Sequence, residues 1–153
     1  MIDVEIYESG SGGEFNLVND DLETINGLTN QVYLALFGGN VEQSTSDDLN
    51  NLDQRFDWWG NGFLENENQF NSTFEKILSE VALNSSGLSK LKSAAKEDLK
   101  YLEDYADITI NASITGLNRL ELLINLDEPG NISTKIKFVW EGTKNELIQE
   151  ITI

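Results

Sequence analysis

Residues 107–141 read DITINASITGLNRLELLINLDEPGNISTKIKFVWE and contain a long, regular alternation of apolar and polar residues. Apolar and polar residues alternate in three runs, which is typical of strands that bury one face. The turns Gly116-Leu117-Asn118 and Glu128-Pro129-Gly130-Asn131 separate the runs and predict an antiparallel meander. The alternating positions are Ile108, Ile110, Ala112 and Ile114, then Leu120, Leu122, Ile124 and Leu126, then Ile132, Thr134, Ile136, Phe138 and Trp140.

The segments on either side of the meander are also patterned. Residues 142–153 contain Leu147, Ile148 and Ile151, which predict a fourth strand or an extended arm. Upstream, residues 72–104 have apolar side chains at helical spacing and predict a helix pair that begins with a Ser72–Glu75 capping box. The lysines of this segment indicate a solvated helix face, with a site for an acidic partner as the alternative.

The first forty residues predict two further elements. Alternation on both sides of a glycine-rich turn predicts a β-hairpin over residues 1–18, and Asn19-Asp20-Asp21 predicts a second turn. Residues 26–38 have helical spacing, with Asn26 as the expected N-cap and Gly38-Gly39-Asn40 as the expected end. Residues 41–70 are polar around an aromatic block and predict a loop.

Together these segments predict one α+β domain over residues 1–153. It has an N-terminal β-hairpin, about three helices and a C-terminal antiparallel meander of three to four strands, with the helices packed on the sheet.

Composition excludes several classes of function. The chain carries a net charge of −17, and residues 1–54 contain eleven acidic side chains and no lysine or arginine. Such a surface repels nucleic acid and anionic membranes. It suits both solubility and docking onto a basic protein, and a solvated surface is the favoured explanation for most of these residues. The chain has no histidine and no cysteine, so the usual general base, thiol nucleophile and thiolate metal sites are excluded.

The remaining chemistry would depend on carboxylates. Glu65 and Glu67 lie near the aromatic block and could form a glycosidase pair, but nothing nearby indicates a groove and an exposed loop is the favoured interpretation. The acidic pairs Asp20-Asp21 and Asp47-Asp48 lack the spacing of a calcium loop. We therefore expect no enzyme, no metal site and no cofactor.

The block Arg55-Phe56-Asp57-Trp58-Trp59-Gly60-Asn61-Gly62-Phe63 combines two tryptophans, two phenylalanines and the first basic residue of the chain. Adjacent tryptophans point in different directions on a strand or helix, so at least one leaves the local core plane. Aromatic residues with an arginine are typical of protein–protein contacts. The block is therefore either a plug for the core of this domain or an anchor for a partner.

The order of these segments resembles the small baseplate wedge family of Mu-like phages with contractile tails, which is related more distantly to wedge proteins once called tail-lysozyme-like. The resemblance covers residues 1–141, and its most specific part is the block from Arg55 to Gly60. Family members commonly have an Arg-Gly-Trp-Trp-Gly-Asp-like sequence there, from which Phe56-Asp57 and Asn61 depart. Other matching parts are Gly12-Gly13-Glu14-Phe15, Ala35-Leu36-Phe37, Asp98-Leu99-Lys100-Tyr101-Leu102 and Ile136-Lys137-Phe138-Val139-Trp140-Glu141.

The resemblance implies a structural subunit of the virion, present in the host cytoplasm during assembly. Such a subunit joins larger wedge proteins to the first sheath ring and templates sheath assembly by strand pairing. The spike or hub proteins are further candidate partners, and several copies are expected in a six-fold baseplate. The resemblance leaves open an equivalent subunit of a phage-tail-like injection system. The implied partner-binding residues are Asp53, Arg55, Phe56, Asp57, Trp58, Trp59 and Gly60, and the implied strand-pairing residues are Ile136, Phe138, Trp140, Leu147, Ile148 and Ile151.

Overall fold

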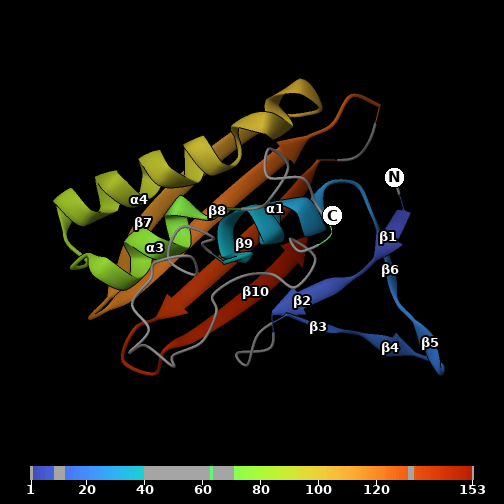
Figure 1. Cartoon of the computed structure of the whole chain (residues 1–153), viewed down its shortest axis with the longest axis horizontal. Helices are drawn as coiled ribbons and strands as arrows, with labels where there is room; N and C mark the ends of the chain where they lie inside the picture. The colour runs from blue at the N-terminus through green and yellow to red at the C-terminus, as the bar shows by residue number, and fades with distance from the viewer. Residues whose placement is uncertain (1, 9–12, 40–62, 64–70, 131–132, 153) are drawn as a thin grey trace.

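A four-stranded antiparallel sheet forms the C-terminal part of the protein (Figure 1). The computed structural model describes residues 2–8, 13–39, 63, 71–130 and 133–152. The predicted α+β class with its C-terminal meander is confirmed, and residues 146–152 form a fourth strand that pairs with the third. The strands are β7 (Asp107–Gly116), β8 (Arg119–Asp127), β9 (Thr134–Glu141) and β10 (Glu146–Thr152), in the order β10-β9-β8-β7.

Cross-strand register gathers the inward side chains of the meander into rows. Ile124 of β8 lies opposite both Ile110 of β7 and Ile136 of β9, and Ile136 lies opposite Ile151 of β10. The first three are buried, and Ile151 packs against the same core. The alternation in the sequence therefore corresponds to one apolar face of the sheet.

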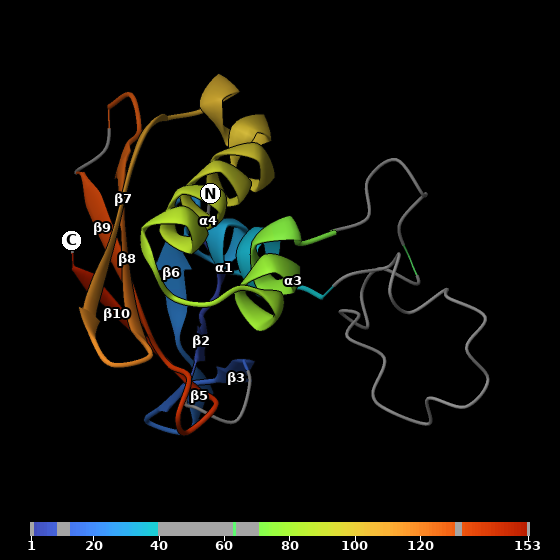
Figure 2. The same ribbon diagram turned by 90° about the vertical axis from the view of Figure 1, so that its left-hand side faces the viewer.

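Within the described part of the chain, three α-helices cover that face and none covers the other (Figure 2). They are α1 (Thr29–Phe37), α3 (Thr73–Glu80) and α4 (Ser85–Asp98), and a short 3-10 helix, η3 (Lys100–Asp104), follows α4. Phe37 of α1 is central to the packing, because its ring centroid lies 5.0 Å from that of Phe138 and 5.6 Å from that of Phe74. Aromatic contacts therefore join α1, α3 and β9 in a single core.

The predicted helix pair is present, and side chains cap both of its α-helices. The Ser72 hydroxyl accepts a hydrogen bond from the Glu75 amide at 2.9 Å, and the Asn84 side chain accepts one from the Gly87 amide at 3.0 Å. Gly87 is required at its position, because a Cβ there would lie 2.1 Å from the Ala82 carbonyl oxygen. The segment Asn84-Ser85-Ser86-Gly87 thus starts α4.

The start of α1 differs from the prediction. Asn26 is the last residue of a strand, opposite Ile2, and α1 begins three residues later after an N-cap at Leu28 without a side-chain cap. Glu128, from the turn between β8 and β9, accepts a hydrogen bond from the Leu28 amide at 3.2 Å. A carboxylate is stabilised at a helix N-terminus by the free amides and the helix dipole, so a distant residue replaces the expected local cap.

The N-terminal strands also extend further than the predicted hairpin of residues 1–18. Six short strands form three pairs: β2 pairs with β3, β4 with β5, and β1 with β6. Asn19 and Asp20 form the turn between β4 and β5 with φ of 55° and 65°, which Asn and Asp tolerate well. The strands are β1 (Ile2–Val4), β2 (Ile6–Glu8), β3 (Gly13–Phe15), β4 (Leu17–Val18), β5 (Asp21–Leu22) and β6 (Thr24–Asn26).

These strands form what we call the N-terminal lobe, residues 2–8 and 13–26. Its three pairs meet at a junction where the Glu5 amide donates to the Glu23 carbonyl and the Glu23 amide donates to the Asn16 carbonyl, each at 2.9 Å. The Asn16 side chain also donates to the Glu23 carboxylate. The junction satisfies backbone groups where the chain changes its pairing partner, so the three short pairs act as one unit.

Candidate partner-binding surfaces

The partner-binding residues expected from the sequence lie outside the described residues. This holds for Asp53 and for the block Arg55-Phe56-Asp57-Trp58-Trp59-Gly60, and also for the carboxylate pair Glu65 and Glu67. The structure does describe the points where this segment leaves and rejoins the fold, at Gly39 and Ser72.

Gly39 and Ser72 are joined directly by hydrogen bonds. The Ser72 amide donates to the Gly39 carbonyl at 2.8 Å, and the Gly39 amide donates to Glu75 Oε2 at 3.1 Å. The Ser72 hydroxyl also donates to the Leu36 carbonyl near the end of α1. Gly39 has a φ of 89°, a conformation that glycine adopts readily at a helix end. The two ends of the segment that carries the aromatic block are thus fixed to each other and to the core.

Buried carboxylates surround this connection. Burial raises the pKa of Glu75, the hydrogen bond from Gly39 opposes the shift, and the nearby charge of Glu8 adds to it. Burial likewise raises the pKa of Asp98, which accepts hydrogen bonds from the Phe74 and Thr73 amides at 2.7 and 3.2 Å. Both groups bind backbone donors at the start of α3 or the end of α1, so their role in the fold is structural.

The expected strand-pairing residues lie on two strands with different surroundings. Ile136, Phe138 and Trp140 belong to β9, which lies between β8 and β10 and is paired on both sides. Leu147, Ile148 and Ile151 belong to β10, which is the outermost strand on its side of the sheet. Only an outer strand has backbone groups available for a further strand. Of the two strands, β10 therefore has the geometry that pairing with a neighbour requires.

The N-terminal lobe packs next to β10 through β2. The Glu8 amide of β2 donates to the Gln149 side chain at 3.2 Å. This contact involves the side chain of Gln149, and no ladder joins β2 to β10 among the described residues. A strand added beside β10 would therefore lie next to the lobe.

The open face of the sheet is polar and rich in ion pairs. Arg119 lies 3.2 Å from Glu141, Lys144 lies 3.6 Å from Glu146, and Lys137 pairs with Glu150. These pairs are partly exposed, and each contributes at most a small part of the stability. This face therefore carries basic as well as acidic side chains, whereas the N-terminal lobe carries acidic side chains and no lysine or arginine.

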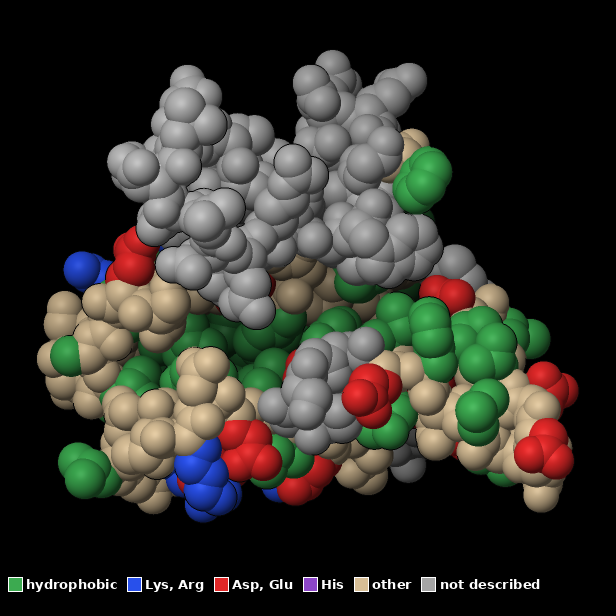
Figure 3. Space-filling view, turned by 60° about the horizontal axis from the view of Figure 1, so that its bottom comes forward, with side chains coloured by type: hydrophobic (Ala, Val, Ile, Leu, Met, Phe, Trp, Pro, Cys, Tyr) green, Lys and Arg blue, Asp and Glu red, His purple; other side chains and the backbone are tan. Residues whose placement is uncertain are grey.

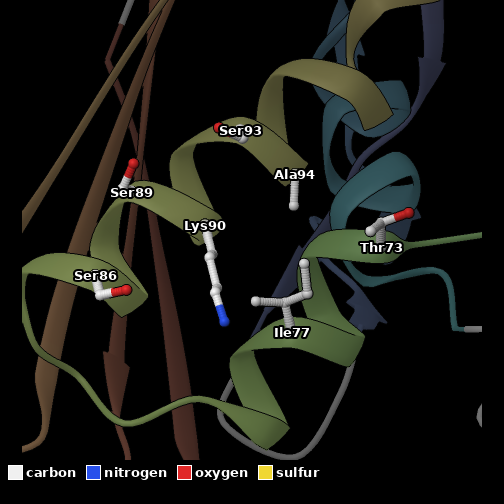
Figure 4. A pocket seen from close by; sticks show the side chains of 7 residues that line it. All are labelled: Thr73, Ile77, Ser86, Ser89, Lys90, Ser93 and Ala94. Atoms are coloured by element: carbon white, nitrogen blue, oxygen red, sulfur yellow. The ribbon is translucent and has the colours of Figure 1, made fainter.

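A shallow groove of about 420 Å³ lies between α3 and α4 (Figure 4). Lys90, Ile77 and Ala94 point into it, whereas the hydroxyl groups of Ser89 and Ser93 point away from Lys90. Ligand sites need several polar groups directed at one point, together with an enclosed apolar wall. The groove offers one amine, the side chains of Thr73 and Ser86 and a few methyl and methylene groups without an enclosed wall, so it provides no basis for a binding or catalytic site.

Asn30 and Tyr33 bind the N-terminal lobe to α1, and sequence reasoning missed both. The buried Asn30 side chain donates to the Val4 carbonyl at 2.6 Å and accepts from the Ile6 amide at 3.1 Å. Tyr33 donates to Glu8 Oε2 at 2.7 Å, and burial, followed by this interaction with Glu8, raises the pKa of Tyr33. The available signal was an asparagine within an apolar helical stretch, since a buried amide requires partners.

Comparison with protein-family models, curated proteins and solved structures found no match to this chain. Among the described residues, no group of three or more Asp or Glu side chains is placed to hold a metal ion. No helix in the described part of the chain is long and apolar enough to cross a membrane.

Proposed function

We propose that this protein is a wedge subunit of a contractile phage tail baseplate. It joins larger wedge proteins to the first ring of sheath and templates sheath assembly by strand pairing. The proposal makes it a virion component without catalytic activity. The Arg55-to-Gly60 block would contact a larger wedge protein, and central spike or hub proteins are further candidate neighbours.

The position of β10 is the observation that carries the proposal. Templating by strand pairing requires an outermost strand with unpaired backbone groups on one side, and β10 is such a strand. Its apolar residues Leu147 and Ile151 are fixed against the core, so the edge is held in a defined position. The resemblance of the block from Arg55 to Gly60 supports the choice of a baseplate over other assemblies.

An engineered disulfide tests how β10 takes part. Val139 of β9 lies opposite Ile148 of β10, and the chain contains no native cysteine. Directly opposite residues have Cβ atoms about 5 Å apart, so the Val139→Cys, Ile148→Cys pair can hold β10 on β9. The control pair, Glu121→Cys with Val139→Cys, joins the two internal strands β8 and β9.

Each variant is mixed with the sheath protein encoded by the same genome. Sedimentation measures binding to the sheath protein, and negative-stain imaging shows whether sheath assembly is nucleated. If the outer edge of β10 accepts a sheath strand, both oxidised variants nucleate sheath as well as the wild-type protein does. Loss of nucleation by the β9–β10 pair alone, restored by reduction, would mean that β10 itself is exchanged. Failure of the wild-type protein to bind sheath protein or a larger wedge protein would contradict the proposal.

An equivalent subunit of a phage-tail-like injection particle would have the same structure and contacts. The genes beside this one distinguish the two particles. A carboxylate-based cell-wall hydrolase is the remaining alternative, and it would require Glu65 and Glu67. A peptidoglycan-degradation assay on the wild-type protein, Glu65→Gln and Glu67→Gln tests it, and an activity that either substitution abolishes would replace the structural proposal.

A further inference from the structure

The N-terminal lobe exposes an unusual amount of apolar side chain. Phe15, Leu17 and Leu22 are 58%, 65% and 45% exposed, and Ile2 and Val18 are exposed as well. Leu17 and Leu22 lie opposite each other in the β4–β5 pair, so they are on the same face. Phe15 ends β3 two residues before Leu17 and adds a further exposed apolar side chain next to this pair in the chain. We call Phe15, Leu17 and Leu22 the apolar patch.

The surroundings of the apolar patch are uniformly acidic. The lobe carries seven acidic residues and no lysine or arginine. Asp3, Glu14, Asp20 and Asp21 are exposed. In Figure 3 hydrophobic side chains gather over the lobe, at the right of the view, with acidic side chains at its outer end. An exposed apolar surface rimmed by polar groups is typical of a protein interaction site.

The lobe is held firmly enough to present this patch in one orientation. Asn30 bonds both sides of the β1–β2 boundary, and Tyr33 bonds Glu8 at the end of β2. The junction of Glu5, Asn16 and Glu23 joins the three strand pairs internally. A surface fixed in advance loses less conformational entropy on binding, which favours its use as a docking site.

We propose that the apolar patch docks a second protein whose contact surface has an apolar centre ringed by lysine and arginine. Charge complementarity selects this occupant, because a basic rim would be attracted to the acidic residues around the patch. A second copy of this chain would bring an equally acidic rim and would be repelled. The proposal does not depend on the baseplate assignment, since it uses only the exposure and charge of the lobe.

A set of synthetic peptides serves as the probe. The first is an amphipathic helix of lysine and leucine, the second replaces its leucines with serine, and the third replaces its lysines with glutamate. Titration of the ¹⁵N-labelled full chain, followed by NMR, gives both the affinity and the binding site. We expect the lysine–leucine peptide to shift amides of residues 13–22, the lysine–serine peptide to bind more weakly, and the glutamate–leucine peptide not to bind.

Two variants test the patch itself. Leu17→Thr with Leu22→Thr should weaken binding of the lysine–leucine peptide by about tenfold or more, as expected for truncation at the centre of an interface. The matched control is Leu117→Thr, because Leu117 is 95% exposed in the β7–β8 turn but lies outside the lobe. That variant should bind as the wild-type protein does. Circular dichroism and thermal melting establish that each variant is folded.

A third variant keeps the apolar patch and tests the acidic rim. Asp20→Asn with Asp21→Asn preserves side chains that suit the β4–β5 turn, including an oxygen that can accept from the Leu22 amide. This variant should bind the lysine–leucine peptide several-fold more weakly than the wild-type protein does, and its affinity should depend less on salt concentration.

Three results would overturn the proposal. The first is that the wild-type protein and the double threonine variant bind the lysine–leucine peptide with equal affinity. The second is a set of NMR shifts located outside the lobe. The third is a concentration-dependent dimer in analytical ultracentrifugation that the double threonine variant abolishes, since that would make a second copy the occupant.

Discussion

The Tyr33 hydroxyl donates a hydrogen bond to Glu8 Oε2 at 2.7 Å, and this bond joins α1 to β2 within the protein interior. Together with the Asn30 amide it makes the N-terminal lobe continuous with the main body. The lobe carries the strongly acidic surface, whereas the aromatic segment leaves the body at the opposite end of α1. Both candidate partner-binding regions are therefore attached to the same helix.

Removing the Tyr33 hydroxyl should destabilise the protein. Tyr33→Phe takes a donor away from a buried carboxylate, and such a loss costs about 1–3 kcal/mol. Urea denaturation measures the free energy of unfolding. The control is Tyr105→Phe, because Tyr105 is 63% exposed and its substitution should have little effect. Equal stability of the two variants would show that the Tyr33–Glu8 bond does not hold the lobe.

Ser72 has two roles that a single substitution removes together. Its hydroxyl caps α3 and donates to the Leu36 carbonyl, so Ser72→Ala should lower the free energy of unfolding by about 1–2 kcal/mol. The control is Ser85→Ala at the exposed first residue of α4. Thermal melting of both variants provides the comparison, and an unchanged midpoint for Ser72→Ala would show that the Ser72 hydroxyl stabilises neither α3 nor its contact with the end of α1.

The buried Glu75 should make stability depend on pH in a defined direction. Burial raises its pKa above the ordinary value of 4.5, so the folded state binds a proton more tightly than the unfolded state does. The stabilisation from this proton is complete below the ordinary value and is lost as the pH rises through the raised pKa.

Glu75→Gln isolates this contribution, because glutamine keeps an oxygen that can accept from the Gly39 amide. The variant should be more stable than the wild-type protein at neutral pH, and the difference should shrink as the pH approaches 4.5 from above. Urea denaturation between pH 4.5 and pH 8 measures both effects. A difference that grows as the pH falls would show that the pKa of Glu75 is lowered.

The aromatic block should act in binding and contribute little to folding. Arg55→Ala with Trp58→Ala is expected to leave circular dichroism and the melting temperature unchanged and to abolish co-purification with the larger wedge protein. The matched control is Lys90→Ala with Tyr105→Ala, which removes a cation and an aromatic ring elsewhere. Loss of folding by the first variant would indicate that the block is a core plug, and retained co-purification would exclude it as the anchor.

Patterns within short stretches of sequence predicted the helices and strands that are determined by residues close together in the chain. Alternation identified β7, β8 and β9, and Ser72 was correctly assigned as a cap. Hydrogen bonds between residues far apart in the chain have no corresponding pattern in the sequence. The Leu28 amide binds Glu128, a hundred positions away, so the local candidate Asn26 was wrongly chosen as the cap.

The Ser72–Glu75 capping box shows how tertiary contacts modify a local motif. The Ser72 amide, which Glu75 would bind in an isolated helix, donates to the Gly39 carbonyl instead. Glu75 then accepts from the Gly39 amide. The strand-pairing surface also depends on tertiary structure. Alternation could place apolar residues on β9 and β10, but it could not determine which of the two strands is outermost in the sheet.

We propose that this protein occupies a baseplate between the larger wedge proteins and the first sheath ring. An image of the assembled particle at residue resolution, obtained by electron cryomicroscopy, would locate the chain and its neighbours. We predict the chain at that position, with a sheath strand along the outer edge of β10 and the block from Arg55 to Gly60 against a larger wedge protein. A particle that lacks the chain, or that contains it with the β10 edge facing solvent, would contradict the account.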